Sequence, residues 1–242
     1  MTDQPSPATG LIPGVLTFAA AQACERALLD GMRDERGGTC RALVWRTDKA
    51  IIVPRGLPSR DYFAAASAAV EALGYPVHER DTGGDLTPQD PGVVNISLAF
   101  RLDGSDAAIK DAYQRLTDPV IAFLSQAYGI EARVASIPGA FCDGAFNIAV
   151  GAKKLAGTAQ KWKLLGGEGS ARRVAVLGHV ALMVSNDLPP AIDALNAFYA
   201  ASGSDRRIIQ GRHVTLDEHL GRAVSADSAA RALSAFLADR GM

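Results

Sequence analysis

Apolar side chains recur along the chain with two spacings, one typical of helices and one typical of strands. Over residues 105–128 they repeat every three or four positions, which predicts an amphipathic helix that Pro119 breaks or kinks. Thr17 is expected to cap a helix, and Thr215 to form a capping box with Glu218. The same helical spacing predicts four more helices, at residues 18–32, 61–73, 190–201 and 227–238.

Short apolar runs separated by turn residues predict strands. Residues 41–45 and 50–53 are expected to pair as a hairpin that turns at residues 47–49. Residues 146–150 are expected to form a second hairpin with the strand that begins at Lys153. Strand pairs of this kind, with helices between them, indicate an α+β fold. Three further strands are predicted, at residues 93–100, 131–135 and 173–184.

Length, charge and cysteine content narrow the class of protein. A chain of 242 residues, 48% apolar and 21% charged, suits one large domain. We expect residues 14–242 to form this domain, after a flexible lead-in at residues 1–13. A formal net charge of −1 argues against nucleic-acid or membrane-surface partners. The three cysteines lack metal-ligand spacing, so no metal-ligating residues are predicted. Because the sequence has no apolar run that could span a bilayer, we expect a soluble cytoplasmic protein.

The segment K-K-L-A-G-T-A-Q, residues 153–160, places two lysines ahead of small side chains. Small side chains let a backbone lie close to a ligand, and an ammonium group can stabilise an anion there. Because side chains alternate along a strand, Lys153 and Lys154 should point to opposite faces, and we take Lys154 as the candidate ligand-binding residue. A hairpin with solvated lysines is the alternative interpretation.

A second segment, residues 77–100, combines a basic side chain with paired glycines. Arg80, Thr82, Gly83 and Gly84 precede a D-P-G turn and a strand. The glycines let backbone N–H groups approach an anion or an acyl chain without a Cβ in the way. Arg80 can bring a planar, permanently charged donor to the same ligand. The segment therefore predicts one wall of a ligand site.

Together these motifs resemble the lipoate-protein ligase A family, which is grouped with the biotin and lipoate ligase catalytic domains. The lysine segment resembles the family pattern G-x-K-I/V/L-x-G-S/T-A, and the glycine segment resembles its ligand loop. The run around His179 resembles a family strand that borders the acyl pocket. The resemblance covers about residues 15–200. It implies a mixed, mostly antiparallel sheet flanked by helices, as in biotin ligases and class II synthetase cores.

The resemblance also implies an activity. Such an enzyme activates lipoate or octanoate with ATP and Mg²⁺ to an acyl-adenylate, and passes the acyl group to a lysine of a lipoyl carrier domain. The carrier would be a glycine cleavage H protein or a 2-oxoacid dehydrogenase subunit. Many such ligases carry a C-terminal accessory domain, for which this chain ends too early, so a separate accessory subunit is a further expected partner. Lys154 would hold the adenylate, and the ligand site would include Arg80, Thr82, Gly83, Gly84, Asn95, Gly157, Thr158, Ala159 and His179.

Three positions depart from the family pattern. Asp85 replaces the third glycine of the loop, Gln89 replaces a histidine before the D-x-G turn, and Glu79 replaces the first arginine of a pair. Two carboxylates in an anion-binding loop would weaken ATP binding, unless they hold Mg²⁺ or pair with Arg80. The departures indicate a distinct subgroup and leave the substrate and the reaction open.

Two other functions fit the same motifs. Octanoyltransferases that resemble this family use a cysteine just upstream of the lysine motif as an acyl-thioester nucleophile. Cys142, in F-C-D-G, lies near that position, and an inert core cysteine is the alternative interpretation. A non-catalytic acyl-binding relative could have lost activation through Asp85 and Gln89. Biotin ligation is disfavoured because the G-R-G-R-x-G-like loop expected for it is missing.

Overall fold

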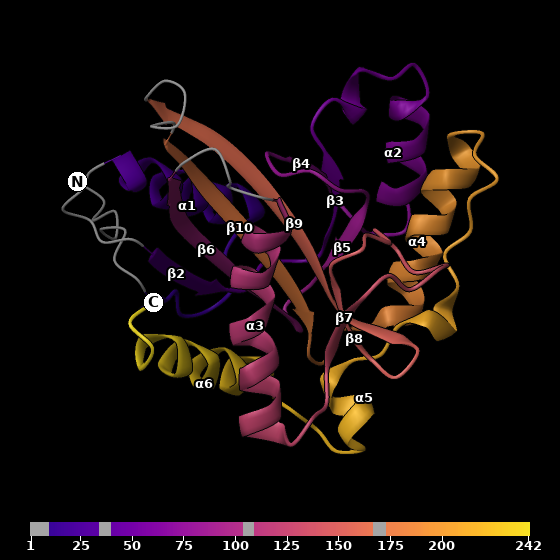
Figure 1. Ribbon diagram of the computed structural model, residues 1–242. Coiled ribbons are helices and arrows are strands. Elements are labelled where there is room, and N and C mark those ends of the chain that lie inside the picture. The colour runs from indigo at the N-terminus through magenta and orange to yellow at the C-terminus, as the bar shows by residue number, and fades with distance from the viewer. Residues whose placement is uncertain (1–9, 34–39, 104–108, 167–172) are drawn as a thin grey trace.

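A seven-stranded sheet forms the centre of the protein (Figure 1). The structure is a computed structural model, and it describes residues 10–33, 40–103, 109–166 and 173–242. Neighbouring strands of this sheet run antiparallel, except that β1 runs parallel to β2. The order across the sheet is β1 (Gly10–Leu11), β2 (Cys40–Trp45), β6 (Val93–Asp103), β10 (Arg173–Met183), β9 (Lys153–Gly166), β8 (Asn147–Val150) and β7 (Arg133–Ala135).

Three further strands form a smaller sheet, in which β3 lies in the middle, parallel to β4 and antiparallel to β5. The predicted hairpin of β2 with β3 is therefore wrong, because the two strands belong to different sheets. The segment between them is held against the chain before the first helix: Thr47 Oγ1 and Asp48 N both donate to the Leu16 carbonyl, at 2.9 and 3.1 Å. The bounds of the smaller sheet are β4 (Val77–Arg80), β3 (Ala50–Pro54) and β5 (Thr87–Gln89).

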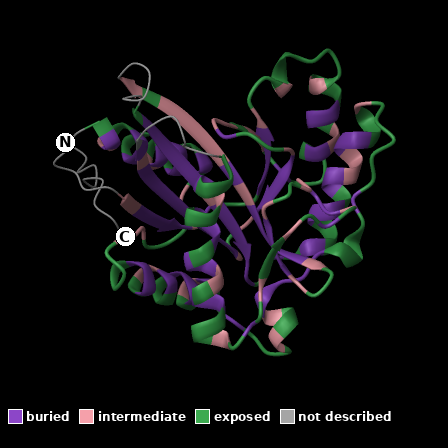
Figure 2. Cartoon of the chain, in the orientation of Figure 1, coloured by how far each residue is buried: buried purple, intermediate pink, exposed green. Residues whose placement is uncertain are grey.

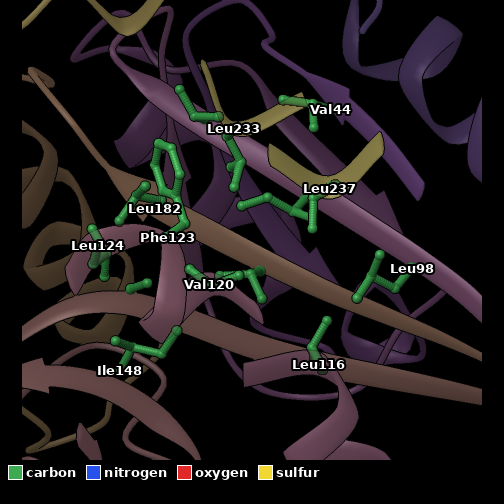
Figure 3. Close-up of a cluster of buried hydrophobic side chains, with 14 of the residues drawn as sticks. Val44, Leu98, Leu116, Val120, Phe123, Leu124, Ile148, Leu182, Leu233 and Leu237 are labelled. Atoms are coloured by element: carbon green, nitrogen blue, oxygen red, sulfur yellow. The ribbon is translucent and has the colours of Figure 1, made fainter. Parts of the chain in front are cut away.

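Helices cover both faces of the large sheet (Figure 1). Helices α3 (Ile109–Tyr128) and α6 (Ala226–Ala238) pack on one face, and α1 (Phe18–Asp30) packs on the other. Each fully buried leucine, isoleucine or phenylalanine stabilises the fold by about 1.5–3 kcal/mol. Figure 3 shows the first of these interfaces, where the labelled side chains are Val44, Leu98, Leu116, Val120, Phe123, Leu124, Ile148, Leu182, Leu233 and Leu237.

The smaller sheet has its own apolar core with α2 (Phe63–Glu71) and α4 (Leu188–Ala201). In Figure 2 the inward faces of these helices and most of both sheets are buried, and the outward faces of the helices are exposed. Helix α5 (Leu216–Leu220) follows and begins with the predicted capping box. Short 3-10 helices lie at Gly31–Arg33, Leu57–Ser59 and Gln210–Arg212.

The helix predictions are confirmed to within a few residues, and the Thr17 cap is confirmed by a hydrogen bond from Ala20 N to its hydroxyl. The hairpin of β8 and β9 is confirmed, with Val150 opposite Lys153. The break at Pro119 is wrong, because α3 runs through that residue as one helix. The predicted flexible lead-in at residues 1–13 is wrong in part, because Gly10–Leu11 forms β1. Residues 1–9 lie outside the described residues. The first four residues of the helix predicted at 105–128 also lie outside them.

The fold class is as predicted: a mixed, mostly antiparallel sheet flanked by helices. Within the described ranges, every helix is too short or too polar to cross a membrane.

Candidate active site

Lys154 is fully buried at the start of β9. The pairing of β8 with β9 shifts register at this point, so that one extra residue, Leu155, enters β9. A bulge of this kind changes the alternation of side chains along the strand. The ammonium group accordingly lies against Gly157, three residues further on: a Cβ on Gly157 would be 3.2 Å from Lys154 Nζ. Gly157 therefore leaves room for the end of the lysine, which a Cβ would contact tightly.

The Lys154 ammonium donates to two consecutive backbone carbonyls, Phe141 O at 2.6 Å and Cys142 O at 3.2 Å. It also lies 4.3 Å from the centre of the Phe141 ring. Burial lowers the pKa of Lys154 to about 8, against an opposing effect of negative charge on Cys142. The charge of Arg80 lowers this pKa further. At neutral pH the group remains mostly protonated, so a desolvated cation lies directly beneath the backbone of Cys142.

Cys142 adopts a left-handed backbone conformation, with φ of 44°, which is uncommon for a residue with a side chain. Its Sγ accepts a hydrogen bond from the backbone N–H of Asp85 at 3.2 Å. Gly84 has φ of 107°, and a Cβ there would lie 2.9 Å from Cys142 Sγ and 2.6 Å from Arg80 Nη2. Gly84 is therefore required by space as well as by backbone conformation. The glycine loop, Arg80 and the cysteine predicted from separate motifs meet at this point.

Arg80 fixes the loop through backbone and hydroxyl acceptors. Its Nη2 donates to the Asp85 carbonyl at 2.7 Å, and its Nη1 donates to Thr87 Oγ1 at 3.0 Å. Its Nε is buried without a hydrogen-bond partner among the described residues. The suggested pairing of Arg80 with the Asp85 carboxylate is not found: Arg80 binds the carbonyl of that residue, and the carboxylate binds Tyr199 and Arg206.

The rest of the glycine loop lies along β9. Thr82 is buried, and Gly83 N donates to the Gln160 carbonyl at 3.4 Å. On the same strand, Thr158 Oγ1 donates to the Phe146 carbonyl at 2.8 Å, which ties β9 to the segment that follows Cys142. Of the predicted ligand-site residues, Arg80, Gly84 and Gly157 lie at Cys142 or Lys154, and Gly83 and Thr158 join the glycine loop and the segment after Cys142 to β9.

His179 and Asn95 lie in a separate polar network on the face of the sheet that α1 covers. His179 Nδ1 is 2.8 Å from Glu25 Oε1, and its Nε2 is 3.0 Å from Asn95 Oδ1. The Asn95 side chain exchanges two hydrogen bonds with that of Gln89, each 3.0 Å long. Ala159 is directly opposite His179 in the sheet. Gln89, the residue that departs from the family histidine, is thus a buried amide partner in this network.

His213 was not singled out by the sequence, although it adjoins the site. Its Nε2 accepts from Phe141 N at 3.0 Å, and its ring stacks on the Phe141 ring with centres 4.6 Å apart. Burial, followed by the charge of Lys154, lowers the pKa of His213 to about 4, so the ring is neutral at physiological pH. It fixes the backbone that presents Cys142. No local motif marks a contact between residues 72 positions apart.

A cavity of about 470 Å³ lies beside Lys153. Asp187 and Pro189 at the start of α4 line it, together with Gln210 and Glu218 from the segment before and within α5. His213 lines the cavity and also adjoins Lys154. Neither Cys142 nor Lys154 lines this cavity, so the cavity and the chemically unusual side chains occupy different places. In the described part of the chain, no group of three histidine, cysteine or acidic residues could hold a metal ion.

Comparison with known proteins places this geometry in a family. Residues 17–238 match the family model of the lipoyl protein ligase A/B catalytic domain, and the chain belongs to that family. It is an enzyme of the lipoate ligase or octanoyltransferase kind.

Two relatives show how similar the sequence is to other proteins. A protein from Cupriavidus necator is 36% identical over 199 residues, which cover 78% of each chain. An octanoyl-GcvH:protein N-octanoyltransferase from Kyrpidia tusciae is 35% identical over 182 residues, which cover 74% of this chain and 62% of that protein's length.

Two solved structures share the fold. Lipoate-protein ligase A bound with ATP has a TM-score of 0.60 at 18% identity, covering 96% of this chain and 86% of its own. A putative lipoate protein ligase from T. acidophilum with bound lipoic acid has a TM-score of 0.60 at 22% identity, covering 96% and 85%. At these identities the likeness concerns the fold.

Proposed function

We propose that the protein is an acyltransferase that moves an octanoyl or lipoyl group from one lipoyl carrier domain to a lysine of another, through a thioester on Cys142. The observation that carries this proposal is the setting of the Cys142 sulfur. It accepts the Asp85 N–H, its backbone lies on the buried Lys154 ammonium, and Gly84 leaves room beside it. A core cysteine without a function would require none of these features.

The reaction balances without a nucleotide. The Cys142 thiolate attacks the carbonyl carbon of the acyl amide on the donor lysine, and the carbonyl oxygen becomes an oxyanion. Collapse of this adduct breaks the C–N bond, and the leaving lysine amine takes up a proton. The amine of the acceptor lysine then attacks the thioester, loses a proton and releases the thiolate. One amide is exchanged for another, so no free energy from ATP is needed.

The residues at the site fit this reaction better than adenylate formation. The Lys154 ammonium donates to the carbonyl of Cys142 itself, which places the cation beside the proposed nucleophile, and the 35% identical relative from Kyrpidia tusciae is an octanoyltransferase. A desolvated cation and backbone donors stabilise negative charge most strongly where water is excluded, as an oxyanion formed at Cys142 requires. We therefore assign ATP and Mg²⁺ no step in the proposed mechanism.

The test is to incubate the purified protein with an octanoylated glycine cleavage H protein, without ATP, and to add an unmodified lipoyl domain afterwards. We expect one octanoyl group on Cys142, labile to hydroxylamine, and then its transfer to the lipoyl domain. AMP release from octanoate and ATP, with no acyl group on Cys142, would favour the ligase. Thermal stabilisation by octanoate without turnover would favour a non-catalytic binding protein.

A further inference from the structure

Asp85 is the residue at which the glycine loop is tied to the smaller half of the molecule. Its carboxylate has three partners: Oδ1 accepts from Leu86 N at 2.8 Å, and Oδ2 accepts from the Tyr199 hydroxyl at 2.9 Å and pairs with Arg206. Tyr199 lies near the end of α4, and Arg206 follows a few residues later. The sequence motifs did not indicate the contacts with Tyr199 and Arg206, which join positions more than a hundred residues apart.

The backbone of Asp85 meets the reactive sulfur. Its N–H donates to Cys142 Sγ at 3.2 Å, and its carbonyl accepts from Arg80 Nη2 at 2.7 Å. The side chain and the main chain of one residue therefore contact different segments of the protein. A force that moves the carboxylate also moves the N–H that contacts sulfur. Because Gly83 and Gly84 precede Asp85 and restrict the backbone little, the side chain is an effective place to fix this N–H.

Tyr199 is well suited to hold the carboxylate. It is buried, and its ring packs edge-on against Phe198 with centres 6.3 Å apart. Burial, followed by the negative charge of Asp85, raises the pKa of Tyr199, so its hydroxyl stays protonated and donates. The guanidinium of Arg206 lies 5.2 Å from the centre of the Tyr199 ring and pairs with the same carboxylate oxygen. The three side chains form one unit, which we call the Asp85 clamp.

We propose that Tyr199 and Arg206 are positioning residues for acyl transfer: by holding the Asp85 carboxylate, they fix the Asp85 N–H against the Cys142 sulfur. This inference rests on the proposed function. The N–H stabilises negative charge on the attacking and leaving sulfur only while it points at Sγ. Neither Tyr199 nor Arg206 needs to touch the acyl donor. Loss of the clamp should therefore slow formation of the thioester without weakening binding of the carrier domain.

The first experiment measures single-turnover acylation of Cys142 in Tyr199→Phe and Arg206→Gln. Tyr199→Phe removes one hydroxyl and keeps the ring on Phe198. A lost hydrogen bond to a charged group corresponds to about a tenfold change in rate, so we expect roughly five- to thirtyfold slower acylation in each variant. The dissociation constant of the octanoylated carrier should stay within about twofold. Arg206→Lys, which keeps the charge, should recover part of the rate, and Arg207→Gln on the same exposed segment is the matched control.

A double-variant cycle tests the route of the effect. Asp85→Ala removes the clamped carboxylate and leaves the backbone N–H in place. If Tyr199 acts through Asp85, the Tyr199→Phe change should slow acylation in the wild-type protein and have almost no further effect in the Asp85→Ala protein. An equal effect in both backgrounds would overturn the inference.

The pH dependence of alkylation of Cys142 by iodoacetamide, followed by peptide mass spectrometry, gives a readout that needs no acyl donor. Besides Tyr199, the groups that interact electrostatically with Cys142 include Lys154 and Tyr113, while Arg80 and Asp143 act on Lys154. These stay unchanged in the variants, so a shift of the alkylation profile to higher pH in Tyr199→Phe reports the loss of the N–H contact. An unshifted profile together with unchanged acylation would contradict the clamp. An absence of thioester in the wild-type protein would instead contradict the proposed function, while the alkylation profile would still test the clamp.

Discussion

The two neighbouring lysines of β9 lead into two different regions of the molecule. Lys154 is fully buried between the Phe141 and Cys142 carbonyls, in a closed region with a strained cysteine and a fixed backbone donor. The Lys153 side chain is 44% exposed, 3.9 Å from Glu218, at the edge of the open cavity. The residues are identical and adjacent, and because they pair in regular register with Val150 and Ala149, strand alternation points them into different surroundings.

This contrast teaches that open volume and reactivity need not coincide. The cavity beside Lys153 offers space, but Cys142 does not line it, and the side chains of Lys153 and Glu218 at its edge are partly exposed to solvent. Around Cys142, burial strengthens the electrostatic interactions of the Lys154 ammonium and the Asp85 N–H, because the local dielectric constant is low. We therefore expect changes on the Cys142 side to affect chemistry strongly, and changes on the Lys153 side to affect it little.

Replacement of the sulfur should have the largest effect. Cys142→Ser keeps the shape of the side chain, but a hydroxyl is a much weaker nucleophile, so transfer between carriers should fall on the order of a thousandfold or more. The measurement is octanoylation of a lipoyl domain from an octanoylated H protein, followed by mass spectrometry. Cys24→Ser and Cys40→Ser are matched controls that should keep the wild-type rate. Activity of Cys142→Ser within tenfold of wild type would place the nucleophile elsewhere.

Removal of the buried charge should come next. Lys154→Met preserves length and apolar contacts but leaves the Phe141 and Cys142 carbonyls without a donor, and should slow Cys142 acylation by about a hundredfold. Single-turnover rates measured with saturating carrier separate this effect from binding. Circular dichroism checks that the variant is folded. A folded Lys154→Met variant that acylates at the wild-type rate would remove the lysine from the mechanism.

The pH dependence of Lys154 separates its chemical role from its structural role. Because its pKa is lowered from 10.5 to about 8, the unfolded chain binds the proton more tightly than the native protein between these values. The contribution of Lys154 to stability therefore rises with pH from about 8 to about 10.5, by on the order of 3 kcal/mol. Acylation should instead fall above pH 8, as the charge is lost. Urea unfolding of the wild type and of Lys154→Met measures the contribution to stability, and single-turnover acylation rates over the same pH range measure the contribution to chemistry. If stability and acylation rate changed with pH in the same direction, the assignment would be contradicted.

His213 should show a smaller effect, mainly on stability. Its pKa is lowered from 6.5 to about 4, so the unfolded chain takes up a proton first as the pH falls. The stability that its neutral form confers is present above pH 6.5 and lost progressively toward pH 4. His213→Gln should be less stable than wild type at pH 7, because the stack on Phe141 is lost, but should lose less stability on acidification. Equal acid sensitivity in the two proteins would refute this account.

Lys153 should give the smallest effect. Its contact with Glu218 is long and solvated, so Lys153→Met should change the acylation rate by less than about twofold and stability by less than about 1 kcal/mol. The comparison with Lys154→Met holds residue type, substitution and strand constant. A large effect of Lys153→Met on acylation would mean that the open cavity takes part in the reaction.

The sequence predicted the parts of this site that lie in continuous segments. The K-K-L-A-G-T-A-Q and R-D-T-G-G segments led to Lys154 and the glycine loop, and F-C-D-G led to Cys142. The prediction that Lys153 and Lys154 point to opposite faces is confirmed, because both pair in regular register with β8 and only Lys154 is buried. The bulge at Leu155, which follows them, was not predicted. The predicted pairing of β2 with β3 failed because proximity in sequence did not reveal that Thr47 is fixed to Leu16.

Contacts over long sequence distances were not accessible from the sequence. His213 and the Asp85 clamp join the site from positions 70 to more than 100 residues away, in segments with ordinary composition. Asp85 itself was noticed, but as a carboxylate that disturbs an anion site; its role as a link to Tyr199 depends on where α4 packs. Only the tertiary arrangement brings a tyrosine and an arginine to that carboxylate.

The most direct test of the account is peptide mapping of the protein after brief incubation with an octanoylated H protein in buffer treated with apyrase. The account predicts an octanoyl group on the peptide that contains Cys142, removed by hydroxylamine and absent from Cys24 and Cys40. An unmodified Cys142 peptide, with octanoylation of a lipoyl domain proceeding only after ATP is restored, would contradict it.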